Sequence, residues 1–315
     1  MTVPPAMGRS GRVPWWDDPA GASVLVRLRA LLPTFPLAER RVAEAVLDDP
    51  AGAAAMTISA LARAGDTSVA TVQRFCRALG FDGYPGLRLA LAAEAGRALR
   101  EDGQREVSGD IRPGEDLATI VEKIAFADAR AVEDTARHLD LDVVGAAVDA
   151  LARARRIDLY GVGASAFVAL DFQQKLHRIG RVAFAWPDPH IALTSAALLS
   201  ARDVAVGVSH TGTTRDTVEA LEEAKRQGAT TIALTNFPRS PLATVADLVV
   251  VTAARETTFR SGAMASRLAQ LTVVDVLFVA VAARSFARTQ RALQRTRQAV
   301  AIRRLPGDGT GGMGQ

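Results

Sequence analysis

The chain has 315 residues, of which 49% are hydrophobic and 23% are charged. This composition excludes an intrinsically disordered chain and leaves room for two folded domains. The net charge of +4 is unevenly spread, since residues 1–100 carry +3, residues 101–283 carry −5 and residues 284–315 carry +6. A single cysteine, Cys76, excludes an intrachain disulfide, so we expect a cytoplasmic protein with Cys76 as a small core residue.

The N-terminal third of the chain predicts a helical domain. Residues 1–22 mix Pro, Gly and Ser without periodicity, which indicates a disordered arm. Over residues 23–100 apolar residues recur at helical spacing in short segments, a pattern typical of a bundle of short helices. Residues 101–129 are rich in polar and turn residues at first, so we predict a linker and a connecting helix there.

Within this bundle, residues 57–80 predict a helix-turn-helix. Thr57 or Ser59 can cap a first helix, Gly65 is expected to supply a left-handed turn, and Ser68 can cap a second helix. The second helix should bury Val72, Phe75, Cys76 and Leu79, and expose Ala70, Thr71, Gln73, Arg74 and Arg77.

The exposed face of that second helix suits the major groove of DNA. Arginine can donate two hydrogen bonds to guanine, glutamine can pair with adenine, and small residues allow close approach. The predicted DNA contacts are Ser68, Thr71, Gln73, Arg74 and Arg77. An ordinary helical hairpin with a solvated polar face is the alternative.

A family resemblance favours DNA binding. Residues 36–50 (P-L-A-E-R-R-V-A-E-A-V-L-D-D-P), with I-S-A-L-A at 58–62 and T-V-Q-R-F-C-R-A-L-G-F-D-G-Y at 71–84, resemble the N-terminal domain of RpiR-type transcription regulators. The resemblance implies a double-stranded DNA partner for this domain.

Residues 130–285 predict a second, α/β domain after helices near 117–139 and 143–154. Amphipathic stretches separate five apolar runs: Ile157 to Tyr160, Val182 to Trp186, Val204 to Val208, Thr231 to Thr235, and Leu248 to Thr252. This alternation indicates a doubly wound, five-stranded parallel sheet covered on both faces. The apolar run at 273–283 is too short to span a membrane, so we expect a buried helix and no membrane partner.

Two hydroxyl-bearing loops follow strands of this sheet. The loop Ser209 to Arg215 opens a helix, where free backbone N–H groups favour an anion, and Gly212 permits close approach. The loop with Gly161, Gly163 and Ser165 is a weaker, similar element. Neither has the residues of a nucleotide-hydrolysis or dinucleotide site, so we predict no cofactor and no metal. Tight turns into capped helices remain the alternative.

These loops belong to a second resemblance. Gly161–Gly180, the S-H-T-G-T-T loop, Ser240–Asp247 and Ser261–Leu271 resemble the sugar isomerase (SIS) domain of RpiR-type regulators. The resemblance implies a phosphorylated sugar bound by Ser165, Ser209, Thr211 and Thr214, and the predicted ligand set also includes Gly163, His210, Gly212 and Glu256. Thr213 stands where the family's S-x-S-G-E-T loop has glutamate, which puts sugar specificity in doubt.

A sensor and an enzyme are both compatible with such a domain. An isomerase needs an acid and a base, for which Glu256, His190 and His210 are the candidates. Because a DNA-binding domain precedes it, we predict a non-enzymatic regulator of carbohydrate metabolism without catalytic residues. A sugar-phosphate isomerase with an accessory helical domain is the alternative, and a scaffold that uses the helices for protein contacts is a third. A homodimer or homotetramer is expected.

The final segment, residues 286–315, predicts a basic helix followed by a disordered, glycine-rich tail. Arginines recur at near-helical spacing without an acidic neighbour: Arg284, Arg288, Arg291, Arg295 and Arg297. This basic face could lie against DNA or against the acidic middle of another chain, and a solvated helix face is equally compatible.

Overall fold

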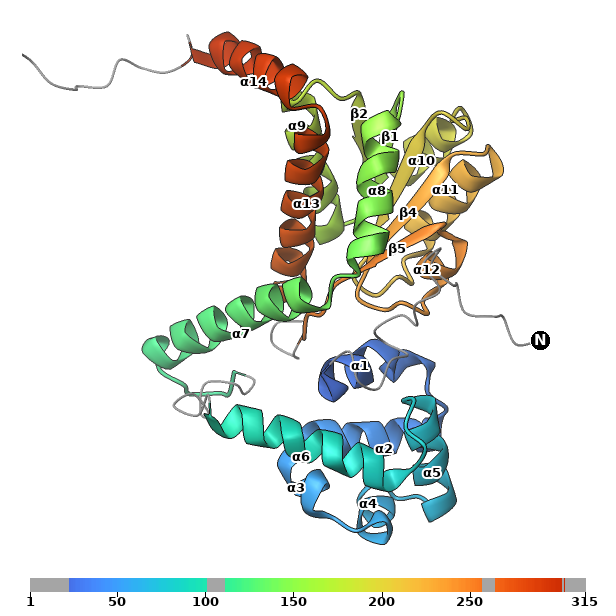
Figure 1. Cartoon of the computed structure of the whole chain (residues 1–315), viewed down its shortest axis with the longest axis vertical. Helices are drawn as coiled ribbons and strands as arrows, with labels where there is room; N and C mark the ends of the chain where they lie inside the picture. Colours follow the sequence, from blue (N-terminus) through green and yellow to red (C-terminus); the bar gives the residue numbers. More distant parts are fainter. Residues whose placement is uncertain (1–22, 101–110, 257–263, 302, 304–315) are drawn as a thin grey trace, which may run out of the picture.

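The computed structural model describes residues 23–100, 111–256, 264–301 and 303 (Figure 1). An all-helical N-terminal part precedes an α/β part with a parallel sheet, which confirms the predicted fold class. The predicted arm at 1–22 and nearly all of the glycine-rich tail lie outside the described residues, as do residues 101–110 of the predicted linker.

Short helices build the N-terminal part. They are α1 (Val24–Leu31), η1 (Leu32–Thr34), α2 (Leu37–Asp48), α3 (Pro50–Ala55), α4 (Ile58–Ala64), α5 (Val69–Ala78) and α6 (Tyr84–Arg100). Their apolar faces share one core, in which the rings of Phe35 and Phe75 meet edge-on with centroids 5.4 Å apart. Cys76 is fully buried in this core, and burial raises the pKa of its thiol to about 11.

The turn between α4 and α5 corrects one expectation. Gly65 has a φ of −88°, so it is not the left-handed residue, and Asp66 takes that conformation with a φ of 44°. Gly65 is required for a different reason. A Cβ at this position would lie 3.1 Å from the backbone Cα and N of Val42, so α4 can approach α2 closely only because the side chain is missing.

Two helices connect the parts. α7 (Leu117–His138) begins at Asp116, whose carboxylate accepts a hydrogen bond from the N–H of Thr119, and α8 (Leu141–Arg153) is capped in the same way by Asp140. Both confirm the helices expected there. α7 packs along α13, whereas α8 lies against the sheet.

The α/β part is a five-stranded parallel sheet with the order β2-β1-β3-β4-β5. The strands are β1 (Ile157–Tyr160), β2 (Ala183–Trp186), β3 (Val204–Val208), β4 (Thr230–Thr235) and β5 (Leu248–Val251), each within one residue of the predicted bounds. Leu159 lies beside Ala185 on one side and Val206 on the other. The strand order reverses between β1 and β3, where doubly wound sheets bind ligands beyond the carboxyl ends of their strands.

Helices cover both faces of the sheet. They are α9 (Ala164–Arg178), α10 (Pro189–Ala196), α11 (Arg215–Arg226), α12 (Pro241–Val245), α13 (Ala265–Arg284) and α14 (Phe286–Ala301). α8, α9 and α13 share the core of one face, and α10, α11 and α12 that of the other. Among the described helices only α13 is long and apolar enough to cross a membrane, but it packs against α7, α8 and α9 as a core helix.

Candidate functional site

The loop after β3 is folded by its own hydroxyl groups. Ser209 is 2% exposed, and its Oγ accepts a hydrogen bond from the N–H of Gly212 and lies 3.1 Å from Oγ1 of Thr214. Gly212 has a φ of 64°, and a Cβ there would lie 2.0 Å from Oγ of Ser240. Ser209 and Gly212 therefore shape the loop, whereas Thr211 and Thr213 are exposed and can reach a ligand directly.

The same loop presents the start of α11. Thr214 is the residue before the helix, and its side chain makes no capping hydrogen bond. Free N–H groups of the first turn and the positive end of the helix dipole therefore face the loop. Such a helix start attracts a phosphoryl group, and Thr211 and Thr214 add hydroxyl donors.

The loop after β1 joins the same edge of the sheet. Gly163 precedes α9 with a φ of 59° and a ψ of −127°, a conformation that glycine adopts readily, and no side chain caps the helix. Gly161 is required for packing, since a Cβ there would lie 2.8 Å from the carbonyl oxygen of Ser165. Ser165 lies in the first turn of α9 and is half-buried. Because β1 and β3 are neighbours, both loops lie on either side of the strand-order reversal.

His210 and Glu256 supply buried polar atoms near these loops. The His210 ring packs edge-on against Phe237 at 5.5 Å, and its Nδ1 is buried without a hydrogen-bond partner among the described residues. Burial lowers the pKa of His210, and the nearby Glu256 carboxylate opposes that shift. Oε1 of Glu256 accepts a 2.9 Å hydrogen bond from the N–H of Ser266, while its Oε2 is buried without a partner in the same described part.

Two further polar residues were missed by the sequence reasoning. Oγ of Ser266 and Nε2 of Gln270 are buried on α13 and have no hydrogen-bond partner within the described ranges. They stand four residues apart on one face of α13, which is the pattern that could have revealed them. Buried polar atoms without a protein partner usually bind water or a ligand. No group of His, Cys, Asp or Glu in the described residues is arranged to hold a metal ion.

The second helix of the predicted helix-turn-helix is α5. Oγ of Ser68 caps it by accepting from the N–H of Thr71 at 3.2 Å. The side chain of Arg74 is 59% exposed, its Nη2 donates to Oγ1 of Thr71 at 3.0 Å, and its Nε lies 3.4 Å from Glu39. Arg77 is exposed on the last turn and Gln73 is partly exposed.

Thr71 departs from the expectation. It is only 4% exposed, so the prediction that it faces solvent is wrong. Its hydroxyl lies 3.1 Å from Oγ of Ser68 and accepts a hydrogen bond from Arg74, whose Nε in turn lies 3.4 Å from Glu39 of α2. Thr71 therefore positions the Arg74 guanidinium.

Comparison with known proteins decides the family. Residues 22–97 match the helix-turn-helix domain of the rpiR family, and residues 150–280 match the SIS domain. The chain belongs to the RpiR family of transcription regulators. It is 34% identical over 286 residues to the regulator HexR of Pseudomonas aeruginosa. The matched region covers 91% of this chain and 98% of HexR. It is 31% identical to RpiR of Escherichia coli over 82% of this chain and 86% of that protein.

Solved structures agree with this membership. The chain is similar to the NanR protein of Vibrio vulnificus complexed with ManNAc-6P, with a TM-score of 0.58 and 30% identity over 90% of this chain and all of that chain. The sugar isomerase domain of an RpiR transcription factor from Sphaerobacter thermophilus matches 56% of this chain and 97% of its own, with a TM-score of 0.52 and 28% identity. This RpiR-family chain is thus a transcriptional regulator with a SIS domain.

Proposed function

We propose that this regulator binds a double-stranded operator with α5 and that a phosphorylated sugar in the SIS domain controls its operator affinity. The observation that carries the proposal is the pair of loops after β1 and β3, which present glycine, hydroxyl groups and two helix starts at one edge of the sheet. Sugar phosphates combine an anion with many hydroxyl groups, and this edge offers partners for both. The relative NanR, complexed with ManNAc-6P, supports the same ligand class.

In this proposal the phosphoryl group and the sugar ring occupy different parts of the edge. The phosphoryl group lies at the start of α11 and contacts Thr211, Thr214 and the backbone of Gly212, with Ser209 holding that loop in shape. Gly163 and Ser165 close the site from the start of α9. His210 and Glu256, each with a buried atom that has no hydrogen-bond partner among the described residues, hydrogen-bond the sugar hydroxyls.

The domain order favours a sensor over an isomerase, because a helix-turn-helix domain precedes the SIS domain. Burial lowers the pKa of His210, which keeps the imidazole neutral at pH 7, and one Glu256 oxygen is already engaged by the N–H of Ser266. These features suit recognition of hydroxyl groups by fixed hydrogen bonds. We therefore propose that ligand binding is converted into a change of operator affinity and that the sugar phosphate is released unchanged.

On the DNA side, we propose that Arg74, Arg77 and Gln73 reach base edges and that Ser68 contacts a phosphate. The domain limits proposed for this function are 23–100 for DNA binding and 130–285 for the ligand, with residues 101–129 as their connection and 286–315 as an accessory basic segment. The charge of +3 in residues 1–100 supports the first assignment.

We further propose that two or more chains associate through the SIS domain. α9 and α13 pack together and are bridged by Lys175, which pairs with Asp171 and Asp275. Large apolar side chains are exposed on these helices, namely Phe167, Leu170, Val276 and Val279. An exposed apolar surface of this kind favours a second copy of the chain, and a homodimer or homotetramer would bring two α5 helices to half-sites about 34 Å apart.

A pair of variants tests the proposal. Operator affinity and sugar-phosphate affinity are measured for the wild type, Arg74→Ala and Thr211→Ala. Arg74→Ala should weaken operator binding by about tenfold or more and leave ligand binding intact, because a bidentate contact to a base contributes roughly 1–3 kcal/mol. Thr211→Ala should do the reverse.

Two controls sharpen this test. Arg74→Lys keeps the charge but lacks the planar guanidinium, so it should weaken specific binding more than non-specific binding. Incubation with a panel of sugar phosphates, followed by product analysis, detects turnover. Conversion of any panel member, or loss of both affinities in either alanine variant, contradicts a sensor with two separate sites.

A further inference from the structure

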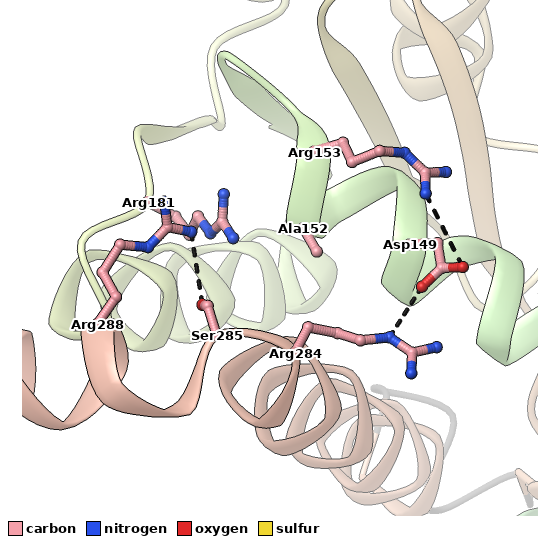
Figure 2. A pocket seen from close by; sticks show the side chains of 7 residues that line it. All are labelled: Asp149, Ala152, Arg153, Arg181, Arg284, Ser285 and Arg288. Atoms are coloured by element: carbon pink, nitrogen blue, oxygen red, sulfur yellow. Dashed lines mark hydrogen bonds and ion pairs between the residues drawn. The ribbon is translucent and has the colours of Figure 1, made fainter.

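An arginine-rich pocket lies at the opposite edge of the sheet from the two loops. It has a volume of about 480 Å³ (Figure 2). It lies between the C-terminal end of α8, the residue Arg181 just before β2, and the junction of α13 with α14. Its lining consists of Asp149, Ala152, Arg153, Arg181, Arg284, Ser285 and Arg288. The lining therefore contains four guanidinium groups and one carboxylate.

That carboxylate neutralises only one side of the pocket. Oδ1 of Asp149 lies 2.8 Å from Nε of Arg284, and its Oδ2 lies 3.9 Å from Nη1 of Arg153. Figure 2 shows these three side chains together on one side, with Arg181 and Arg288 on the other side of Ala152. Because one negative charge is shared by two guanidinium groups, even this half of the pocket keeps a positive charge.

The other side has no counter-charge among the described residues. Neither Arg181 nor Arg288 forms an ion pair there, and the nearest polar partner is the hydroxyl of Ser285, 3.5 Å from Nη2 of Arg288. Burial and the neighbouring charge of Arg288 lower the pKa of Arg181. Two like charges held together in this way are stabilised by an anion between them, and guanidinium groups match the oxygens of a phosphoryl group.

We propose that this pocket is a second anion site, which binds the phosphoryl group of a small molecule between Arg181, Arg288 and Ser285. The position argues against operator DNA as the occupant, since Figure 1 shows α5 and α14 at opposite ends of the chain. The volume is that of a small-molecule pocket, which typically measures about 300–1,000 Å³. The site therefore differs from the sugar site in both location and chemistry, because it is lined by guanidinium groups rather than by hydroxyl groups and helix starts.

Calorimetric titration of the full chain tests this site, with inorganic phosphate, pyrophosphate and glucose 6-phosphate as separate probes. Arg288→Gln should weaken the binding of at least one probe by about tenfold, because it removes a charge-assisted hydrogen bond to the anion. The double variant Arg181→Gln/Arg288→Gln should abolish this binding. Affinity for pyrophosphate or glucose 6-phosphate well above that for inorganic phosphate identifies a phosphorylated metabolite, and equal affinities identify free phosphate.

Matched variants separate this pocket from general positive charge and from the sugar site. Arg291→Gln removes an exposed charge one turn further along α14, outside the pocket lining, and should leave affinity unchanged. Asp149→Asn removes the only carboxylate and should tighten binding by about threefold or more, since it removes a like-charge repulsion. Thr211→Ala should not change binding at this pocket. A single site abolished by Thr211→Ala, or equal weakening by Arg288→Gln and Arg291→Gln, overturns the proposal.

Light scattering on the same variants tests the competing occupant. If Arg288→Gln reduces the oligomer mass while none of the three probes binds the wild-type pocket, the arginines receive an acidic surface of another copy, and the proposed anion site is wrong. Unchanged oligomer mass together with the loss of probe binding supports it.

Discussion

Gly163 and Gly212 both have a positive φ, but their surroundings differ. A Cβ at Gly163 would meet no atom within 4 Å, whereas at Gly212 it would overlap Ser240 and lie 2.9 Å from Oγ1 of Thr235. Gly163→Ala should therefore cost only the backbone term, which is roughly 1–3 kcal/mol for a side chain forced into a sparsely populated backbone conformation. Gly212→Ala should cost more, because the loop after β3 must also move away from Ser240.

Urea unfolding and sugar-phosphate titration of the two variants measure this difference. We expect Gly212→Ala to lose more stability than Gly163→Ala and to lose ligand affinity through the displaced loop. Equal losses of stability would mean that the contact with Ser240 relaxes freely and that only the backbone conformation matters at Gly212.

His210 predicts a pH dependence of stability. Burial holds its pKa below the ordinary value of about 6.5, so the folded protein favours the neutral ring while the unfolded chain binds the proton more readily. The contribution of His210 to stability is thus complete above pH 6.5 and is lost as the pH falls toward the lowered pKa. Asparagine keeps a polar side chain that does not titrate.

The measurement compares urea unfolding of wild type and His210→Asn between pH 7.5 and pH 5.5. All other titrating groups are common to both proteins. The loss of unfolding free energy on acidification of the wild type, minus the same loss in His210→Asn, is therefore the contribution of this imidazole. We expect the wild type to lose more stability on acidification than the variant, and parallel pH profiles would contradict a lowered pKa at His210.

A glycine can be needed at position 65 either because its backbone is left-handed or because a Cβ would prevent the close approach of α4 to α2. Two substitutions distinguish these reasons. Asparagine tolerates a left-handed backbone but carries a Cβ, whereas the observed φ of −88° suits any residue that has space. Because the restriction is contact with the Val42 backbone, Gly65→Asn and Gly65→Ala should both destabilise the helical bundle by about 1–3 kcal/mol. Thermal unfolding checks this, and an asparagine variant as stable as wild type would restore the left-handed explanation.

Gly65 also illustrates how far the sequence can predict this fold. Apolar runs located all five strands within one residue, because buried parallel strands need uninterrupted apolar residues. The cap Ser68 was equally readable, and Thr57 was one of two candidates for the cap of α4, since capping is a local interaction. The reason for a glycine at position 65 could not be predicted from the sequence, because it is a contact with Val42 of α2, which lies more than twenty residues earlier in the chain.

The candidate sites can also be divided into residues that a local sequence pattern predicts and residues whose role depends on contacts between distant elements. The glycines and hydroxyl-bearing residues after β1 and β3 could be predicted from the sequence, because they directly follow predicted strands. The burial of Thr71 depends on α2, and the unpartnered Ser266 and Gln270 depend on how α13 meets the loop after β5. The arginine pocket draws its residues from α8, the turn before β2 and the junction of α13 with α14, a combination that no local pattern contains.

Contacts of α1 connect the helical bundle to the SIS domain. The backbone N–H of Ser23, which caps α1, donates to Nε2 of His138 at the end of α7 at 3.3 Å. The pKa of Arg29 on the same helix responds to charges in both the SIS domain and the helical bundle. Burial and Arg255 lower its pKa to about 10, while Asp134 of α7 and Glu94 of α6 oppose the shift. Arg255 directly precedes Glu256 of the candidate sugar site, so the charge of Arg29 on α1 is coupled to a residue next to that site.

If this junction transmits ligand binding, its two carboxylates should differ in effect. Asp134 attracts Arg29 from the SIS side, whereas Glu94 belongs to the bundle itself, where its carboxylate accepts from the N–H of Leu25. Asp134→Asn should therefore reduce the ratio of operator affinities with and without sugar phosphate toward one, from an expected coupling of about 1–3 kcal/mol. Glu94→Gln keeps an accepting oxygen and should leave that ratio unchanged.

Both variants should retain wild-type affinity for each ligand measured alone, because neither residue lies in α5 or in the loops after β1 and β3. Fluorescence anisotropy of a labelled operator, titrated at zero and at saturating sugar phosphate, gives for each protein the two operator affinities whose ratio defines the coupling. Coupling is a property of the contact between domains, so it can be lost while both sites stay intact. A ratio that falls equally in Asp134→Asn and Glu94→Gln would assign the effect to the packing of α1 within the bundle, and the charge across the junction would carry no signal.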